Sequence, residues 1–328
     1  MPCAKSARCA SPGRWRRDSE WPQQYLAMLA TLRTLLVVAA FLAAQRNGIA
    51  RADETQAGLR FSADGAGGFR FDTGHLRGNL HAAEKSLGLT DVTHLPTGTR
   101  VDHGNGLLSH YRVFARGVRF GAGAWDWPSQ TRLLDDGAAE VRWPAADRPF
   151  ALRARYRLLD PDTIEVETTV DATGALPAFE IFLASYFAET FTNAVVRTGS
   201  TAAPIWIEAT PDRGDWQMFS RDAVAREIAG DGRWRMEPNP VAWKFPADYG
   251  GSLAHAQRRS VVGGLTADLQ APAGDAFAVA LPQEHDGHRS LYFSLFGRDL
   301  AAGSVTTVRT RLHIALTVVT DPVRPAEK

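Results

Sequence analysis

The sequence predicts an all-β protein, a large antiparallel β-sandwich, and three observations indicate this class. Apolar and polar residues alternate in many short runs, as expected for strands that bury one face. Turn-forming residues separate these runs. Helical periodicity is nearly absent, because only Leu80 to Leu87 and Arg221 to Ile228 resemble short helices, and neither is long enough to connect parallel strands.

The clearest pair of strands forms a predicted hairpin. In residues 152–158 the apolar side chains share one face and three arginines share the other, and residues 164–170 repeat the alternation. The turn residues Asp160-Pro161-Asp162 lie between the two runs. A three-residue loop pairs arginine with glutamate across the ladder on the solvent face, Arg157 with Glu165 and Arg155 with Glu167.

Further runs with the composition of strands extend over most of the chain. No repeat, low-complexity linker or compositional break divides residues 53 to 328, so we expect a single β-sandwich domain there, with a polar tail from Thr320 onward. The other strand candidates are Leu107–Ala115, Ala138–Trp143, Ala178–Phe187, Ile205–Ala209, Ser260–Leu269, Ala276–Leu281, Arg289–Gly297 and Ser304–Val319.

The segment 28–52 has the features of a secretory signal in the expected order. Arg33 precedes an apolar run over residues 35–44, and the small-residue site Ala50-Arg51-Ala52 follows. The apolar run is shorter than the roughly 20 residues that a membrane span needs. We therefore expect cleavage after Ala52, no membrane span after cleavage, and a secreted or periplasmic protein. Residues 1–27 are arginine-rich and unlike the start of a signal, so we expect them to be a non-native upstream extension.

Composition disfavours several classes of partner and cofactor. Residues 1–52 hold eight basic and two acidic residues, which leaves 29 basic and 34 acidic residues, a net charge of −5, for the expected mature chain. An acidic chain without a run of Lys or Arg argues against nucleic acid or an anionic membrane as the main partner. Cys3 and Cys9 lie before the expected cleavage point, so no disulfide is expected. No P-loop or dinucleotide-binding glycine motif occurs, and we expect no cofactor.

Aromatic residues beside glycines are the candidate ligand contacts. Trp125, Asp126 and Trp127 follow a glycine-rich stretch. Aromatic faces stack on the apolar faces of sugar rings and a carboxylate accepts hydrogen bonds from their hydroxyls, so this group has the composition of a glycan site. Arg112 adds a group suited to a uronate or sulfate, and Trp216 belongs to a second aromatic set. Burial of these tryptophans in the core is the alternative.

Three residues are candidates for acid–base chemistry. Glu284 and His288 lie in one short run, and proton transfer on a sugar needs only one carboxylate and one imidazole across the ring. His110 is a further candidate acid. The pair His285 and His288 lacks the helical frame that places two imidazoles on one face, so we expect no metal site. The alternative is that the run forms a solvated loop.

Glu180 shares one face of a predicted strand with Phe182, Ala184 and Tyr186. A carboxylate on such a face either pairs within the core or belongs to a concave binding surface. The sequence pattern leaves both interpretations open.

Several segments resemble uncharacterised secreted bacterial proteins of the planctomycete type and, through them, the galactose mutarotase-like superfamily. The resemblance implies a β-supersandwich over nearly all of the mature chain and a role in glycan binding or chemistry. Ala184-Ser185-Tyr186-Phe187 is similar to the strand that carries the catalytic histidine of aldose epimerases, with Ala184 in its place. Leu281-Pro282-Gln283-Glu284 is similar to the strand end that carries their catalytic glutamate, shifted by two positions. The other similar segments are 107–114, 124–128, 179–187 and 290–299.

The sequence therefore predicts a secreted carbohydrate-binding protein with its site at Trp125, Asp126, Trp127, His110, Arg112 and Trp216, and with Glu284 and His288 at the edge. One alternative is a carbohydrate-active enzyme, a sugar epimerase or a polysaccharide lyase or hydrolase, in which Glu284 is the base and His110 or His288 the acid. A second alternative is an envelope protein-interaction domain whose tryptophan-rich loops anchor a partner. The sequence decides neither whether the protein is an enzyme nor its oligomeric state.

Overall fold

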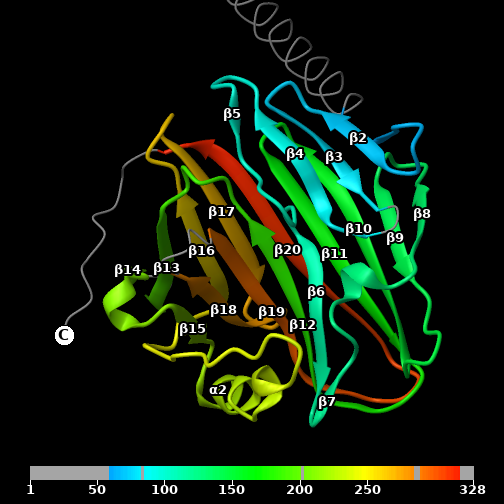
Figure 1. The fold of residues 1–328 in the computed structure, drawn as a ribbon, viewed down its shortest axis with the longest axis vertical. Helices are drawn as coiled ribbons and strands as arrows, with labels where there is room; N and C mark the ends of the chain where they lie inside the picture. Colours follow the sequence, from blue (N-terminus) through cyan, green and yellow to red (C-terminus); the bar gives the residue numbers. More distant parts are fainter. Residues whose placement is uncertain (1–58, 83–84, 201–202, 284–288, 318–328) are drawn as a thin grey trace, which may run out of the picture. The chain divides into compact units, whose positions relative to one another are not determined.

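The computed structural model describes residues 59–82, 85–200, 203–283 and 289–317, which belong to a unit spanning Gln56–Lys328. Three antiparallel sheets make up this unit (Figure 1), which confirms the predicted all-β class and antiparallel sandwich. The expected extension 1–27 and signal 28–52 lie outside the described residues. Within the described ranges no helix has the length and apolar character needed to cross a membrane.

The nine-stranded sheet contains the predicted hairpin and exposes one face. Buried and exposed side chains alternate along the centre of its strand β20. The hairpin has the predicted register, with Arg155 opposite Glu167 and Arg157 opposite Glu165. In spatial order the strands are β14 (Ala203–Glu208), β13 (Asn193–Ser200), β16 (Leu253–Arg259), β17 (Leu265–Pro272), β20 (Val305–Leu316), β11 (Thr163–Ala172), β10 (Phe150–Asp160), β9 (Ala139–Trp143) and β8 (Gln130–Leu133).

The six-stranded sheet is buried on both faces. Ile181 and Leu183 on its strand β12 join the large core shared with the nine-stranded sheet. Phe182 and Ala184 point the other way, into a second apolar cluster that also contains Ala225 of helix α2 (Ala223–Ala229). In spatial order the strands are β15 (Trp216–Ser220), β18 (Ala276–Pro282), β19 (Ser290–Leu300), β12 (Leu176–Tyr186), β6 (Ser109–Ala115) and β7 (Val118–Arg119).

The five-stranded sheet adds side chains such as Leu76 and Leu80 to the large core. It is tied to the turn of the β10–β11 hairpin, where His75 Nδ1 lies 2.9 Å from Asp162 Oδ1 and the Thr73 hydroxyl donates to the Pro161 carbonyl over 2.6 Å. Its strands are β1 (Ser62–Ala63), β2 (Phe69–Asp72), β3 (Leu76–His81), β4 (Gly88–His94) and β5 (Thr99–Arg100). Three single turns of 3₁₀ helix lie in loops, η1 (Ala124–Asp126), η2 (Pro211–Arg213) and η3 (Arg233–Arg235).

Two of the predicted local elements differ from the structure. The helix expected at Leu80 to Leu87 is wrong, because Leu80 and His81 end strand β3 instead. The strand expected from Ser260 begins only at Leu265, after a turn in which Gly263 and Gly264 have positive φ angles that favour glycine. The other predicted helix is confirmed as α2, whose N-terminus is capped by Asp222 through a hydrogen bond of 2.9 Å from the Ala225 amide.

Glu165 is a carboxylate of the nine-stranded sheet that is paired with two arginines. It accepts hydrogen bonds from Arg311, over 2.8 Å, and from Arg157. Burial alone would raise the pKa of Glu165, but the two arginines outweigh it and hold this pKa below its usual value. A carboxyl whose pKa is lowered by folding stabilises the fold above its unfolded pKa, and this contribution is lost as the pH falls.

We therefore expect Glu165→Gln to lower the free energy of unfolding most at neutral pH and progressively less between about pH 6 and about pH 3. Urea unfolding of both proteins across this range measures the difference. Glu227→Gln, which changes an exposed carboxylate on α2, is the control and should follow the wild type. A difference for Glu165→Gln that stays constant with pH would contradict the role assigned to the arginine pair.

Candidate functional site

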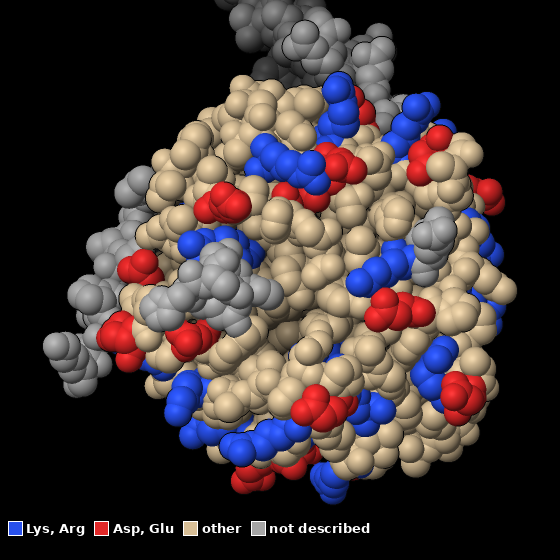
Figure 2. Space-filling view, in the orientation of Figure 1, with Lys and Arg blue, Asp and Glu red and all other residues tan. Residues whose placement is uncertain are grey.

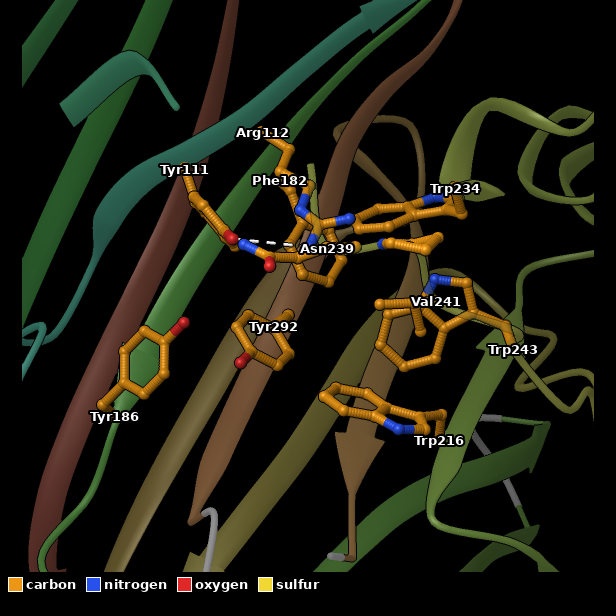
Figure 3. Close-up of a pocket in the computed structure, with 11 residues that line it drawn as sticks. Tyr111, Arg112, Phe182, Tyr186, Trp216, Trp234, Asn239, Val241, Trp243 and Tyr292 are labelled. Atoms are coloured by element: carbon orange, nitrogen blue, oxygen red, sulfur yellow. Dashed lines mark hydrogen bonds between the residues drawn. The ribbon is translucent and has the colours of Figure 1, made fainter. Parts of the chain in front are cut away.

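A pocket of about 210 Å³ opens on the face of the six-stranded sheet that carries the second apolar cluster (Figure 3). Strands β6, β12 and β19 form its floor, the loop after helix α2 forms one wall, and the start of β15 completes it. Seven of the eleven lining residues are aromatic and none is a carboxylate. They are Tyr111, Arg112, Phe182, Tyr186, Trp216, Trp234, Asn239, Pro240, Val241, Trp243 and Tyr292.

The floor is an aromatic surface produced by the two-residue period of adjacent strands. Phe182 of β12 stacks on Tyr292 of β19, with ring centroids 4.5 Å apart, and Tyr186 meets Tyr292 edge to face at 5.7 Å. Burial raises the pKa of Tyr186 to about 12 and that of Tyr292 well above its usual value. Both hydroxyls are therefore neutral groups at physiological pH that donate and accept hydrogen bonds.

A β-bulge in β6 brings two consecutive side chains to the pocket. Tyr111 and Arg112 both lie opposite the single residue Phe182 of β12, so both point to the same face of the sheet (Figure 3). The regular pairs on either side of the bulge are Ile181 with Val113 and Leu183 with His110. Strict alternation would have placed Tyr111 on the opposite face from Arg112.

The same bulge removes His110 from the pocket. The sequence analysis assigned His110 to the same site as Arg112, as a candidate acid. In the structure His110 is fully buried between the sheets, its Nε2 lies 2.9 Å from Thr168 Oγ1, and its ring lies 5.2 Å from that of Trp143. Burial lowers the pKa of His110 to about 3, so the imidazole is neutral. Its packing is that of a core residue, and it has no surface to offer a substrate.

Arg112, predicted at the site, lines the pocket with only 4% of its surface exposed. Its Nη2 donates to the Asn239 carbonyl over 2.7 Å and lies 3.4 Å from the Tyr111 hydroxyl. Its guanidinium carbon lies 5.1 Å from the ring centroids of both Tyr111 and Trp234. The Nε and Nη1 atoms are buried and have no hydrogen-bond partner among the described residues.

A buried ion pair holds the wall of the pocket against the sheet. Arg233 donates to both carboxylate oxygens of Asp231, at 2.9 and 2.8 Å, and to Glu180 Oε2 at 3.1 Å. It also donates to the Ala178 carbonyl over 2.8 Å. Glu180 and Arg233 are both fully buried. Of the two interpretations open for Glu180, the structure gives the first, a paired core carboxylate.

A second arginine fixes the same loop farther along. Arg119 of β7 donates through Nη1 to the carbonyls of Met236 and Pro238, at 3.0 and 2.5 Å. Its other nitrogens donate to the carbonyls of Gly121 and Ala122, at 3.0 and 2.8 Å. Residues 231–243, which we call the wall segment, are thus attached to the sheet at two points.

The wall itself is built from tryptophans. Trp234 lies edge to face on Phe182 at 4.4 Å, and Trp243 meets both Trp234 and Trp216 at nearly perpendicular angles, at 5.3 and 5.5 Å. The indole Nε1 atoms of Trp234 and Trp243 are buried without a hydrogen-bond partner among the described residues. Trp216, which the sequence analysis proposed as a ligand contact, lines the pocket.

The remaining predicted contacts lie around the pocket or away from it. Trp125 stacks on the outer side of Tyr111, with centroids 4.1 Å apart, and its indole donates to Asp126 over 2.9 Å. Trp127 is buried in the large core beneath Arg148. None of these three predicted residues lines the pocket. Glu284 and His288 lie outside the described residues.

Comparison of sequences gives no relative for this chain. No protein-family model matches it, and no curated protein is similar to it in sequence. Comparison of folds gives solved structures that include the Escherichia coli K12 protein assigned as an aldose 1-epimerase, at 12% identity and a TM-score of 0.42, covering 79% of this chain and 99% of that one.

Two further similar structures cover comparable shares of this chain. The aldose epimerase homologue from C. elegans has 10% identity and a TM-score of 0.39, covering 79% of this chain and 99% of that one. A heparan sulfate lyase from Pedobacter heparinus has 8% identity and a TM-score of 0.43, covering 84% of this chain and 42% of that one. The predicted resemblance to galactose mutarotase-like proteins is thus found among solved structures too. It concerns the fold, and it transfers no activity, ligand or site residue to this chain.

The ion pair at the base of the wall segment gives a prediction for stability. Arg233→Met should lower the free energy of unfolding by about 3–5 kcal/mol, because Glu180 is then charged and unpaired in the core. Burial raises the pKa of Glu180 and the charge of Arg233 opposes this rise, so the variant's carboxyl takes up a proton more readily. A carboxyl whose pKa is higher in the folded than in the unfolded protein destabilises the fold at pH values above its pKa in the unfolded protein. This destabilisation is lost at lower pH, where the carboxyl is protonated in both states.

The gap in unfolding free energy between wild type and Arg233→Met should therefore narrow as the pH falls from about 7 to about 4. The double variant Glu180→Gln/Arg233→Met removes both charges and should recover part of the lost stability, with no such narrowing. Urea unfolding of the three proteins at each pH provides the measurement. A gap independent of pH would show that Glu180 is not left charged in the core.

Proposed function

We propose that the protein binds carbohydrate in the aromatic pocket. The observation that supports this proposal best is that one small cavity combines aromatic rings on its floor and wall with polar groups. Sugar rings present apolar C–H faces that pack against aromatic rings, and their hydroxyls need hydrogen-bond partners. The hydroxyls of Tyr186 and Tyr292, the guanidinium of Arg112 and the indole N–H groups of the wall are such partners.

The size of the cavity favours a single sugar ring. Its volume of about 210 Å³ is below the ~300–1,000 Å³ usual for pockets that enclose drug-sized ligands. The ligand is therefore a monosaccharide, or one residue of a longer glycan whose neighbours remain outside.

Binding is proposed in preference to catalysis because the described residues that line the pocket supply no acid–base pair, while Glu284 and His288 lie outside the described residues. His110 is buried in the core on the other side of the sheet. The lining residues include no carboxylate or imidazole. General acid–base chemistry on a sugar requires such groups within hydrogen-bond reach of the reacting atoms.

A titration of the purified protein with a panel of monosaccharides and oligosaccharides tests the proposal. We expect at least one sugar to give saturable binding by calorimetry, and Trp216→Ala to weaken it about tenfold, since one aromatic contact is lost from the pocket. Trp206→Ala is the matched control, because Trp206 packs against His255 in the nine-stranded sheet, away from the pocket. A folded protein that binds no sugar would overturn the proposal and favour the protein-interaction alternative.

We further propose that the protein is exported and cleaved after Ala52, which the order of features in residues 28–52 supports. Expression in a bacterium with an intact secretion pathway should yield a chain outside the cytoplasm whose N-terminus, determined by mass spectrometry, is Asp53. Ala52→Gln should block cleavage, because the signal site requires a small residue there. A wild-type chain that keeps residues 28–52 and stays in the cytoplasm would contradict export.

A further inference from the structure

We infer that the sugar bound in this pocket is anionic, with a carboxylate, sulfate or phosphate group that Arg112 recognises. This inference rests on the proposed function and narrows it to one class of sugar. It depends on the hydrogen-bonding state of a single buried guanidinium and on the chemistry of the atoms around it.

Arg112 differs from the two fully buried arginines of the structure. Arg233 donates through all three of its nitrogens, to Asp231, Glu180 and Ala178. Arg258 also donates through all three, to backbone carbonyls. In Arg112 only Nη2 has partners, while Nε and Nη1 are buried with none among the described residues. The three N–H groups on these two nitrogens therefore have no acceptor among the described residues.

Among the residues that the structure describes, the positive charge of Arg112 also has no counter-ion. No ion pair involving it is found among the described residues, and the lining of the pocket contains no carboxylate. The two flanking aromatic rings compensate only part of the cost of burying a cation. A buried charge in a native structure is normally paired, so the geometry favours a partner that arrives with the ligand.

The neighbouring groups select the same kind of ligand. The unpartnered buried polar atoms of the lining residues are Arg112 Nε, Arg112 Nη1, Trp234 Nε1 and Trp243 Nε1, and all of them are donors. A pocket whose open positions are all donors is satisfied by a group that only accepts, such as an ionised carboxylate, sulfate or phosphate.

This selectivity is local to the pocket. On the face shown in Figure 2, basic and acidic side chains are interspersed and form no continuous positive band. An anionic sugar is thus recognised through the buried guanidinium, and general attraction to a basic surface contributes little.

Calorimetry on the full chain with matched sugars tests the inference. The pairs are glucuronate against glucose, galacturonate against galactose, and glucose 6-sulfate and glucose 6-phosphate against glucose, so that the three anionic groups are compared separately. We expect the best anionic sugar to bind the wild type about 10- to 100-fold more tightly than its neutral partner, as charged hydrogen bonds contribute. Arg112→Gln should abolish this preference. Arg116→Gln, which changes an exposed arginine on the same chain segment, should retain it.

The wild-type comparison decides the inference even where Arg112→Gln fails to fold. Equal affinity for the neutral and anionic members of every pair would overturn it while leaving carbohydrate binding intact. Binding of inorganic sulfate or phosphate that depends on Arg112, with no sugar bound, would support the anion site and overturn the carbohydrate proposal. Retention of the anionic preference in folded Arg112→Gln would show that another group carries it.

Discussion

The pocket depends on the buried ion pair between Arg233 and Glu180. The carboxyl group lies on the pocket face of a central strand, and the arginine comes from the segment that forms the wall. Isolated in the core, each charge would cost several kcal/mol, and only their pairing, with Asp231 completing the arginine's contacts, offsets this cost. The pair therefore ties the position of the wall to that of the floor, since neither charge can be moved alone.

The position of the pocket also depends on the six-stranded sheet, which is buried on both faces. One face of the six-stranded sheet closes the large core, so the strands that carry Phe182 and Tyr292 are held rigidly from behind. The other face is covered in part by α2 and the wall segment, and the pocket lies between this face and the wall segment. The aromatic floor therefore lies on strands that are packed against the large core. Side chains on strands are held more firmly than side chains on loops.

The sequence predicted the solvent-facing parts of the fold better than the buried ones. In the β10–β11 hairpin the charge ladder has the predicted pairs, but the predicted three-residue loop is wrong, because Asp160 pairs with Thr163 and a bulge between Leu158 and Asp160 restores the register. Of the predicted site residues, Arg112 and Trp216 line the pocket, whereas His110 is buried between the sheets. The bulge at Tyr111 and Arg112 shifts the phase of alternation by one residue, and no feature of the local sequence marks it. Trp243 belongs to an irregular segment with no periodicity, so its contact with Trp216 arises only from tertiary packing.

The wall segment is one continuous stretch of chain, whereas the floor is assembled from three strands distant in sequence. This separation has a consequence for how ligand range changes over evolutionary time. A substitution in the floor disturbs both the pocket and the core behind it, and selection against misfolding restricts such changes. Insertions or exchanges in the wall segment alter the shape of the cavity while leaving the large core behind the sheet unchanged, since none of the described residues of that core comes from this segment. Divergent copies of this protein would therefore acquire new ligands first through changes in this one short segment, with the strands almost unaltered.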